Sequence, residues 1–195
     1  MPHASPGRTL TVRARGQAAL GVVLDRPFME RTITLTEDTR TIVEMLANHE
    51  LALKELYQTY AERVPGCKDL WLRLVQDEQC HSDWLESLVS RLGSANPLGS
   101  CGWPRRAAIE SSLEYIQVQI LRARQAEVTP LAALSIAKDL ESALLEKEFF
   151  KVADGACPEV REVLGRLIAG TKQHGQMVTE ALAAAKLSAC RTERA

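Results

Sequence analysis

The sequence predicts an all-α protein, and three observations support this fold class. From residue 36 onward, apolar residues recur every three to four positions, which is the period of one helix face. Most glycines and all prolines beyond residue 36 fall at the ends of these periodic segments, where they interrupt helices. Alternating, β-branched stretches typical of strands occur only within residues 1–35. We therefore expect one helical domain over residues 36–190, preceded by an N-terminal arm.

The arm, residues 1–35, is predicted to be irregular or to form short β-structure. Its stretches "TLTVRA", "LGVVLD" and "RTITLT" are rich in β-branched residues. Pro27 is expected to prevent a helix here. The segment holds five arginines against two acidic residues, so a mobile basic tail is the alternative.

Five helices are expected after the arm, over residues 37–64, 68–92, 105–126, 130–153 and 158–187. Thr36 suits the N-cap of the first, because Glu37 and Asp38 follow in its first turn. "PGC" at 65–67 makes a short turn, and residues 92–104 form a Gly/Pro/Ser-rich connection. Thr129 and Pro130 start the fourth helix as N-cap and first helical residue. "DGACP" separates the fourth helix from the last.

Composition excludes several classes of function. The 24 basic and 25 acidic residues nearly balance, so neither nucleic acid nor an anionic membrane is expected as a partner. No apolar run approaches the ~20 residues that a membrane span needs. The five cysteines are widely spaced and contain no C-x-x-C pair, which argues against disulfides and against a Cys-ligated metal. We expect a cytoplasmic protein with reduced thiols.

Polar residues with metal-binding capacity interrupt the apolar rows. In helix 68–92, Glu78 and His81 occupy positions that otherwise carry Trp71, Leu74 and Leu85. A buried, ionised carboxylate is costly unless it has a partner. Taken alone, the pair is best explained as a hydrogen-bonded couple in the core.

The other helices repeat this pattern. Glu50 lies in the row of the first helix, Glu141 in that of the fourth, and His174 in that of the last. From Glu50 to His81 is 31 residues, and from Glu141 to His174 is 33. The chain therefore reads as two helical hairpins whose polar layers meet. A Glu from each of two helices and Glu-x-x-His from the other two make up a dinuclear carboxylate metal site.

On these residues, the stretch 37–187 resembles the ferritin-like superfamily, and most closely its rubrerythrin branch. Glu50 followed seven residues later by Tyr57 is similar to the first-helix signature of that branch. The resemblance covers about three quarters of the chain. It implies a ferritin-like four-helix bundle in which helix 105–126 is an additional helix within the crossover between the two hairpins.

The resemblance also implies a cofactor and a function. The metal ligands would be Glu50, Glu78, His81, Glu141 and His174. The metal would be iron, as one or two ions, with manganese or zinc as alternatives. Expected activities are reduction of peroxide or oxygen, or ferroxidase chemistry. Tyr57 is the candidate catalytic residue, with packing as its alternative role. Rubrerythrins carry a Cys₄ iron centre that this chain lacks, so an external electron donor is expected, and the chain is expected to form a homodimer.

One ligand position departs from the family pattern. Thr171 stands three residues before His174, where the family has Glu, and threonine cannot bridge two cations as a carboxylate does. Glu148 follows Glu141 by one heptad, about 10.5 Å along a helix, too far to replace the missing bridge directly. Three outcomes stay open. Two ions bind with water or another group filling the gap, or one ion binds chiefly through Glu50, Glu78 and His81 with help from Glu141 or His174, or no metal binds. A metal-free bundle would act as an interaction or dimerisation module.

We expect structural roles, and not metal binding, for four residues near the polar layer. His49 lies about 100° around the helix from Glu50, so we expect it at the surface or at an interface. Trp71 and Trp84 are expected to be packing and interface residues, and Cys80 is expected to face away from the polar layer.

Overall fold

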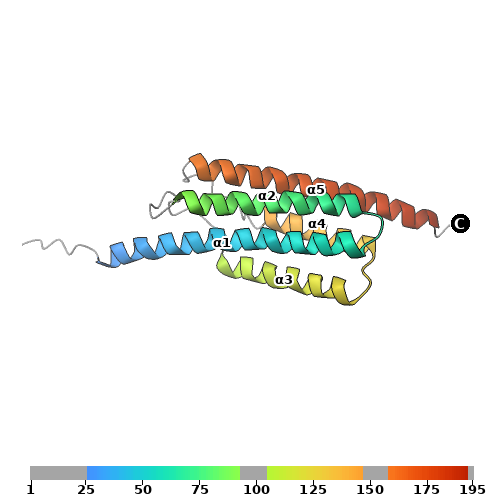
Figure 1. The fold of residues 1–195 in the computed structure, drawn as a ribbon, viewed down its shortest axis with the longest axis horizontal. Coiled ribbons are helices and arrows are strands. Elements are labelled where there is room, and N and C mark those ends of the chain that lie inside the picture. Colours follow the sequence, from blue (N-terminus) through green and yellow to red (C-terminus); the bar gives the residue numbers. More distant parts are fainter. Residues whose placement is uncertain (1–25, 93–104, 147–157, 193–195) are drawn as a thin grey trace, which may run out of the picture.

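The computed structural model describes residues 26–92, 105–146 and 158–192 and, of the long first helix, the side chains only from Arg40 onward. The predicted all-α class is confirmed for these residues, which contain no strand. The helices are α1 (Arg26–Arg63), α2 (Lys68–Leu92), α3 (Arg106–Gln125), α4 (Pro130–Glu146) and α5 (Pro158–Thr192) (Figure 1).

Two helical pairs form the body of the molecule. α1 and α2 pack along their lengths and are joined by a tight turn, in which Gly66 adopts φ +90°, a left-handed conformation that favours glycine. α4 packs on α5, and α5 also contacts α2, which joins the two pairs. α3 lies outside this body along α1 (Figure 1). The expected additional helix therefore exists and occupies the flank of the first pair.

The start of α1 corrects the prediction for the N-terminal arm. The helix begins at Arg26, so residues 26–35 are helical rather than irregular or short-β. The inference that Pro27 prevents a helix was wrong because Pro27 is the second helical residue. Proline is tolerated in a first turn, where the missing N–H would have no acceptor within the helix. Residues 1–25 of the predicted arm lie outside the described residues.

The other boundaries agree closely with the sequence pattern. α2 spans the predicted residues, and α3 is one residue shorter at each end. α4 begins at Pro130 and is capped by Thr129, whose Oγ1 accepts a hydrogen bond from the Ala132 N–H at 3.2 Å. The predicted end of that helix, residues 147–153 with Glu148, lies outside the described residues. α5 continues five residues beyond the predicted end at residue 187.

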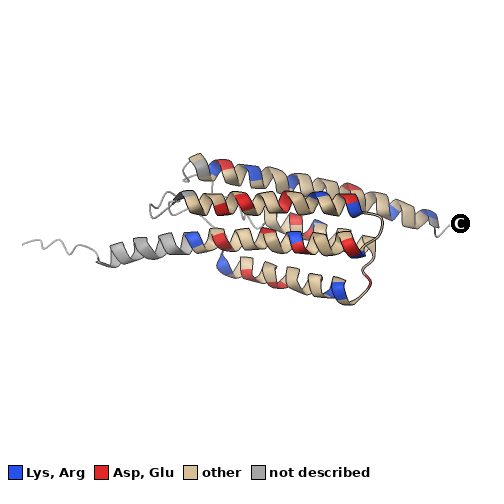
Figure 2. Ribbon diagram, in the orientation of Figure 1, with Lys and Arg blue, Asp and Glu red and all other residues tan. Residues whose placement is uncertain are grey.

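The core is built from the apolar rows. Trp71 is fully buried, with Tyr57 and Tyr60 against its ring at centroid distances of 5.8 and 5.1 Å. Ile116 and Ile120 bury one face of α3 against α1. Charged residues of both signs are spread along the helices (Figure 2). Among the described residues, no helix combines the length and apolar character needed to cross a membrane.

Candidate metal centre

The polar residues of the four apolar rows converge inside the bundle. Each is at most 3% exposed, and they come from four different helices. The five are Glu50 on α1, Glu78 and His81 on α2, Glu141 on α4 and His174 on α5.

Three of them form the closest group. Glu78, His81 and His174 each offer a ligand atom, and these atoms all lie within 4.8 Å of one another. Nδ1 of His81 donates a hydrogen bond to Oε2 of Glu78 at 2.9 Å. Nδ1 of His174 lies 3.1 Å from the other oxygen, Oε1. The two imidazole rings stack with centroids 5.2 Å apart. Glu78 therefore lies between both imidazoles, one on each carboxylate oxygen.

The remaining two carboxylates complete this layer. Oε2 of Glu50 is 3.6 Å from Nδ1 of His81. Oε1 of Glu141 is 3.7 Å from Nδ1 of His174. Each imidazole Nδ1 thus faces Glu78 and one further carboxylate. The five predicted ligands are therefore linked in one chain of contacts, and Glu78, His81 and His174 form its closest group.

Tyr57 belongs to the same layer. Its hydroxyl donates a hydrogen bond to Oε1 of Glu141 at 2.6 Å. Burial, followed by the charges of Glu141 and Glu78, raises the pKa of Tyr57 well above its usual value. The phenol therefore stays protonated and fixes the orientation of Glu141.

Burial and mutual contacts set the protonation of the layer. Burial raises the pKa of Glu50 to about 7, against the lowering effect of His81. Burial also disfavours charge on His81 and His174, but their carboxylate neighbours outweigh it and raise the two pKa values to about 9 and about 11. Burial opposes ionisation of Glu78 too, yet contacts with His174 and His81 hold its pKa below the usual range. At neutral pH both imidazoles are therefore protonated and neutralise carboxylates.

Three buried polar atoms of the layer lack a well-aligned hydrogen-bond partner among the described residues. Oε1 of Glu78, Nδ1 of His174 and Oε2 of Glu141 are buried and make no well-aligned hydrogen bond within the described part of the chain. Buried polar atoms are seldom left in this state. Glu78, His81 and His174 would hold a cation here once the imidazole protons are displaced, and their charge and lone pairs would then be satisfied. The donor set of oxygen and imidazole nitrogen fits iron, manganese or zinc.

α5 approaches His81 closely at one glycine. A Cβ built at Gly170 would overlap Nε2 of the His81 ring, so only glycine fits without displacing the imidazole. Thr171 follows and is 3% exposed. The position at which this chain departs from the ferritin-like pattern is therefore buried, and it carries a hydroxyl.

Sequence reasoning missed one carboxylate beside the cluster. Oδ2 of Asp77 lies 3.4 Å from Nε2 of His174, on the far side of the ring from Glu78. The Asp77 side chain is 40% exposed and therefore reaches solvent. A carboxylate behind an imidazole orients the ring and raises its basicity. The sequence feature that could have indicated Asp77 is its position directly before Glu78.

The expectation that His49 lies at the surface or at an interface was wrong. Its side chain is fully buried rather than at the surface, and Nε2 lies 2.8 Å from Oγ of Ser112 on α3. Burial lowers the pKa of His49. α3 covers this face of α1, so His49 lies in the interior of the chain.

Trp71, Trp84 and Cys80 lie as their positions on α2 predict. Trp71 is fully buried, and Trp84 is half-buried with its ring 5.4 Å from His81 and the Arg166 guanidinium 5.7 Å from its centroid. Cys80 is exposed, as expected from its direction on α2.

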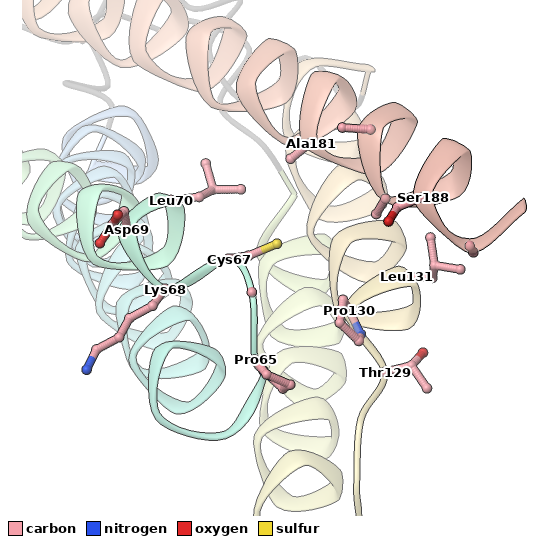
Figure 3. Close-up of a pocket in the computed structure, with 14 residues that line it drawn as sticks. Pro65, Cys67, Lys68, Asp69, Leu70, Thr129, Pro130, Leu131, Ala181 and Ser188 are labelled. Atoms are coloured by element: carbon pink, nitrogen blue, oxygen red, sulfur yellow. The ribbon is translucent and has the colours of Figure 1, made fainter. Parts of the chain in front are cut away.

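A pocket of about 860 Å³ lies at one end of the bundle (Figure 3). It opens between the α1–α2 turn, the start of α4 and the last turns of α5, and Cys67, Pro130 and Ala181 are among its lining residues. Glu141 lies 11 residues beyond Pro130, roughly 16 Å along α4. None of the five cluster residues lines this pocket, so the two are separate features.

Comparison with known proteins does not identify a family. No protein-family model matches the chain, and no curated protein or solved structure matches it either. The ferritin-like resemblance therefore depends on the residues described above.

Proposed function

We propose that this chain is a ferritin-like, rubrerythrin-related metal-binding protein whose buried carboxylate and histidine layer holds iron for redox chemistry. The observation that carries the proposal is the convergence of Glu78, His81 and His174 within 4.8 Å in the core. Glu50 and Glu141 extend the layer on either side.

The cost of burial supports a bound cation. Five ionisable side chains share a water-excluded layer, and charges in such a place are costly unless they are paired. In the metal-free chain the imidazolium protons supply the positive charge. Metal ligands must be deprotonated, so a cation would replace those protons and take over the neutralisation. Histidine nitrogens and carboxylate oxygens are suitable ligands for iron, and manganese and zinc are compatible.

When bound, iron would supply one-electron redox capacity toward oxygen or peroxide. The chain itself contributes orientation and exclusion of water. Tyr57 holds one oxygen of Glu141, Asp77 orients His174, and the closely packed Gly170 keeps the His81 ring in place. Because the sequence has no C-x-x-C pair, we expect electrons to come from a separate donor protein.

Metal content is the first test. Protein from an iron-supplied host is analysed by elemental analysis as wild type, Glu78→Gln and Glu86→Gln. Glu86 is exposed on the same helix and serves as the matched control. We expect iron in wild type and in Glu86→Gln, and loss of most of it in Glu78→Gln, which removes the central carboxylate. Equal metal content in all three proteins, or none in wild type, would contradict the proposal.

Two activity assays separate the redox alternatives. Consumption of hydrogen peroxide with a supplied electron donor indicates a reductase, whereas oxygen-dependent oxidation of added ferrous ion without a donor indicates a ferroxidase. Tyr57→Phe keeps the ring and removes the hydrogen bond to Glu141, so it should lower either activity while retaining metal.

Thr171 supports a second candidate function. It replaces a carboxylate, and the protonated imidazoles already neutralise Glu78 and its neighbours without metal. On this alternative, the chain is a metal-free interaction or dimerisation module. It is favoured if wild type binds no iron, manganese or zinc when each is supplied in excess.

A further inference from the structure

The solvent-facing side of α3 is unusually apolar. Tyr115, Val118 and Leu121 are 44%, 43% and 52% exposed, and they are three of the four large apolar side chains exposed in the described part of the chain. Val118 lies two residues from the buried Ile116, about 200° around the helix. These three residues therefore form a patch on the solvent side of α3. Val118 lies at its centre, nearly opposite Ile116, and Tyr115 lies at the edge nearer α1, within electrostatic range of Tyr60.

This patch is held on a fixed support. α3 packs chiefly on α1 among the described helices. Nη2 of Arg124 lies 2.8 Å from Oε1 of Glu55, and Ser112 contacts the buried His49. The helix also stands at the edge of the bundle, with no other described helix along its outer side (Figure 1). A partner can therefore approach the patch without displacing part of the chain.

The charges around the patch are arranged symmetrically about Val118. Glu114 lies one turn before it and Arg122 one turn after it. Along α3, the arginines at its start are followed by acidic residues in the first half of the exposed face. Basic residues follow at its end (Figure 2). Neither Glu114 nor Arg122 has an ion-pair partner within the described residues. Both charges are available to a second molecule.

An antiparallel second copy satisfies every feature of this face. A two-fold axis through Val118 places the two Val118 side chains together and Tyr115 against Leu121 of the second copy. The same operation places Glu114 opposite Arg122 of the second copy, twice. Two-fold interfaces require such a self-complementary patch, and opposite charges fix its register.

We propose that the chain forms a two-fold dimer through the outer face of α3, centred on Val118. The contact is one helix on one helix, about 30 Å long, which lies at the low end of specific interfaces. The dissociation constant should therefore be on the order of micromolar. The proposal does not depend on metal binding.

Sedimentation velocity of the full chain over a range of concentrations tests the proposal. A reductant is included, so that the exposed Cys80 and Cys190 form no disulfide between molecules. Wild type should pass from monomer to dimer with increasing concentration. Val118→Glu should weaken association at least about tenfold, because it buries two like charges at the axis. Leu187→Glu is the matched control, since Leu187 is an exposed apolar residue on α5, and it should associate as wild type does.

Charge reversal tests the register independently of apolar contact. Glu114→Arg alone and Arg122→Glu alone each place like charges opposite one another, so each should be mainly monomeric where wild type is dimeric. Mixing the two variants should restore a heterodimer, because both pairs across the axis are then of opposite sign. Glu180→Arg on α5 is the matched control and should not change association.

Three results would overturn the proposal. One is a wild-type protein that stays monomeric at all concentrations. This result would overturn the proposal even if the monomer bound another protein or a lipid through Val118. Another is a dimer that Leu187→Glu disrupts and Val118→Glu leaves intact. The third is a mixture of the two charge variants that associates no better than either alone. Circular dichroism of each variant confirms that a lost dimer does not reflect an unfolded chain.

Discussion

Glu78 and the two imidazoles determine how the centre of the bundle balances its charge. His81 donates to one oxygen of Glu78, and His174 lies against the other. Because both rings face Glu78 through Nδ1, the same atoms that hold protons in the metal-free protein would hold a cation. Protons and metal therefore compete for one set of atoms.

Gly170 gives a sharp test of this geometry at a residue that cannot bind metal. In Gly170→Ala the new methyl group overlaps Nε2 of His81, so the ring must rotate away from Glu78. We expect metal affinity to fall about 10- to 100-fold, as when the support of a ligand is lost. Isothermal titration with zinc or manganese measures this change.

Gly165→Ala is the control for that variant. Gly165 lies on the same helix, and a Cβ there meets no other atom. Alanine at this position should leave affinity unchanged and stabilise the fold by about 1 kcal/mol through helix propensity. Equal affinities in the two alanine variants would show that His81 does not bind the metal.

A second prediction at the residue scale concerns the amount of metal bound when Thr171 is replaced by glutamate. Thr171 is buried one turn before His174 on α5, so Thr171→Glu adds a carboxylate near the layer. We expect more metal bound per chain, because a further carboxylate can bridge two cations. Thr179→Glu, at an exposed threonine two turns further along α5, should bind as wild type does. An unchanged stoichiometry in Thr171→Glu would mean that position 171 is not a missing bridge.

The sequence was sufficient to place the central residues but not those around them. Glu50, Glu78 and His174 occupy core positions of helices with clear apolar rows, so helical periodicity alone predicts their burial and convergence. Asp77 was not predicted because it lies at the edge of its apolar row. It reaches His174 only because of how α2 and α5 are rotated relative to each other. That rotation is a property of packing, which one helix pattern does not contain.

At the scale of elements, helix starts and neighbours were harder to predict than helix existence. Pro27 was interpreted as a helix breaker, whereas position within the helix decides what proline does. His49 was expected at the surface or an interface because it points about 100° away from Glu50 on α1. It is buried instead because α3 docks on that side, which the pattern of α1 does not contain.

The two faces of α3 make an element-scale prediction. Ile116 is fully buried against α1, so Ile116→Ala should destabilise the fold by about 2–5 kcal/mol, the usual cost of removing a buried aliphatic side chain. Val118→Ala, two residues away on the exposed face, should change the stability of the monomer by no more than about 0.5 kcal/mol. Urea unfolding at low protein concentration measures both. Similar losses in the two variants would show that α3 is not docked through its Ile116 face.

At the scale of the whole molecule, the buried layer couples folding to pH. The folded-state pKa values of His81 and His174, about 9 and about 11, lie above the ordinary value of 6.5. The pKa of Glu50, about 7, lies above 4.5. The folded chain therefore holds more protons than the unfolded chain over this range, and the free energy of unfolding falls as pH rises. The contribution of the two imidazoles is complete below pH 6.5 and is lost as pH rises through their folded values.

Bound metal should stabilise the fold more at high pH than at low pH, which is opposite to the pH dependence of the metal-free chain. Chelator-treated protein should melt several degrees lower at about pH 9 than at about pH 6, since about 1 kcal/mol corresponds to roughly 2–4 °C for a chain of this size. With saturating zinc, the gain in melting temperature should be larger at the higher pH, because fewer protons compete for the ligands. Glu86→Gln should retain both trends, and a His81→Gln/His174→Gln double variant should lose both. A metal-free melting temperature that rises between these pH values would show that the imidazoles are not protonated in the folded chain, and the charge balance inferred for the cluster would then be incorrect.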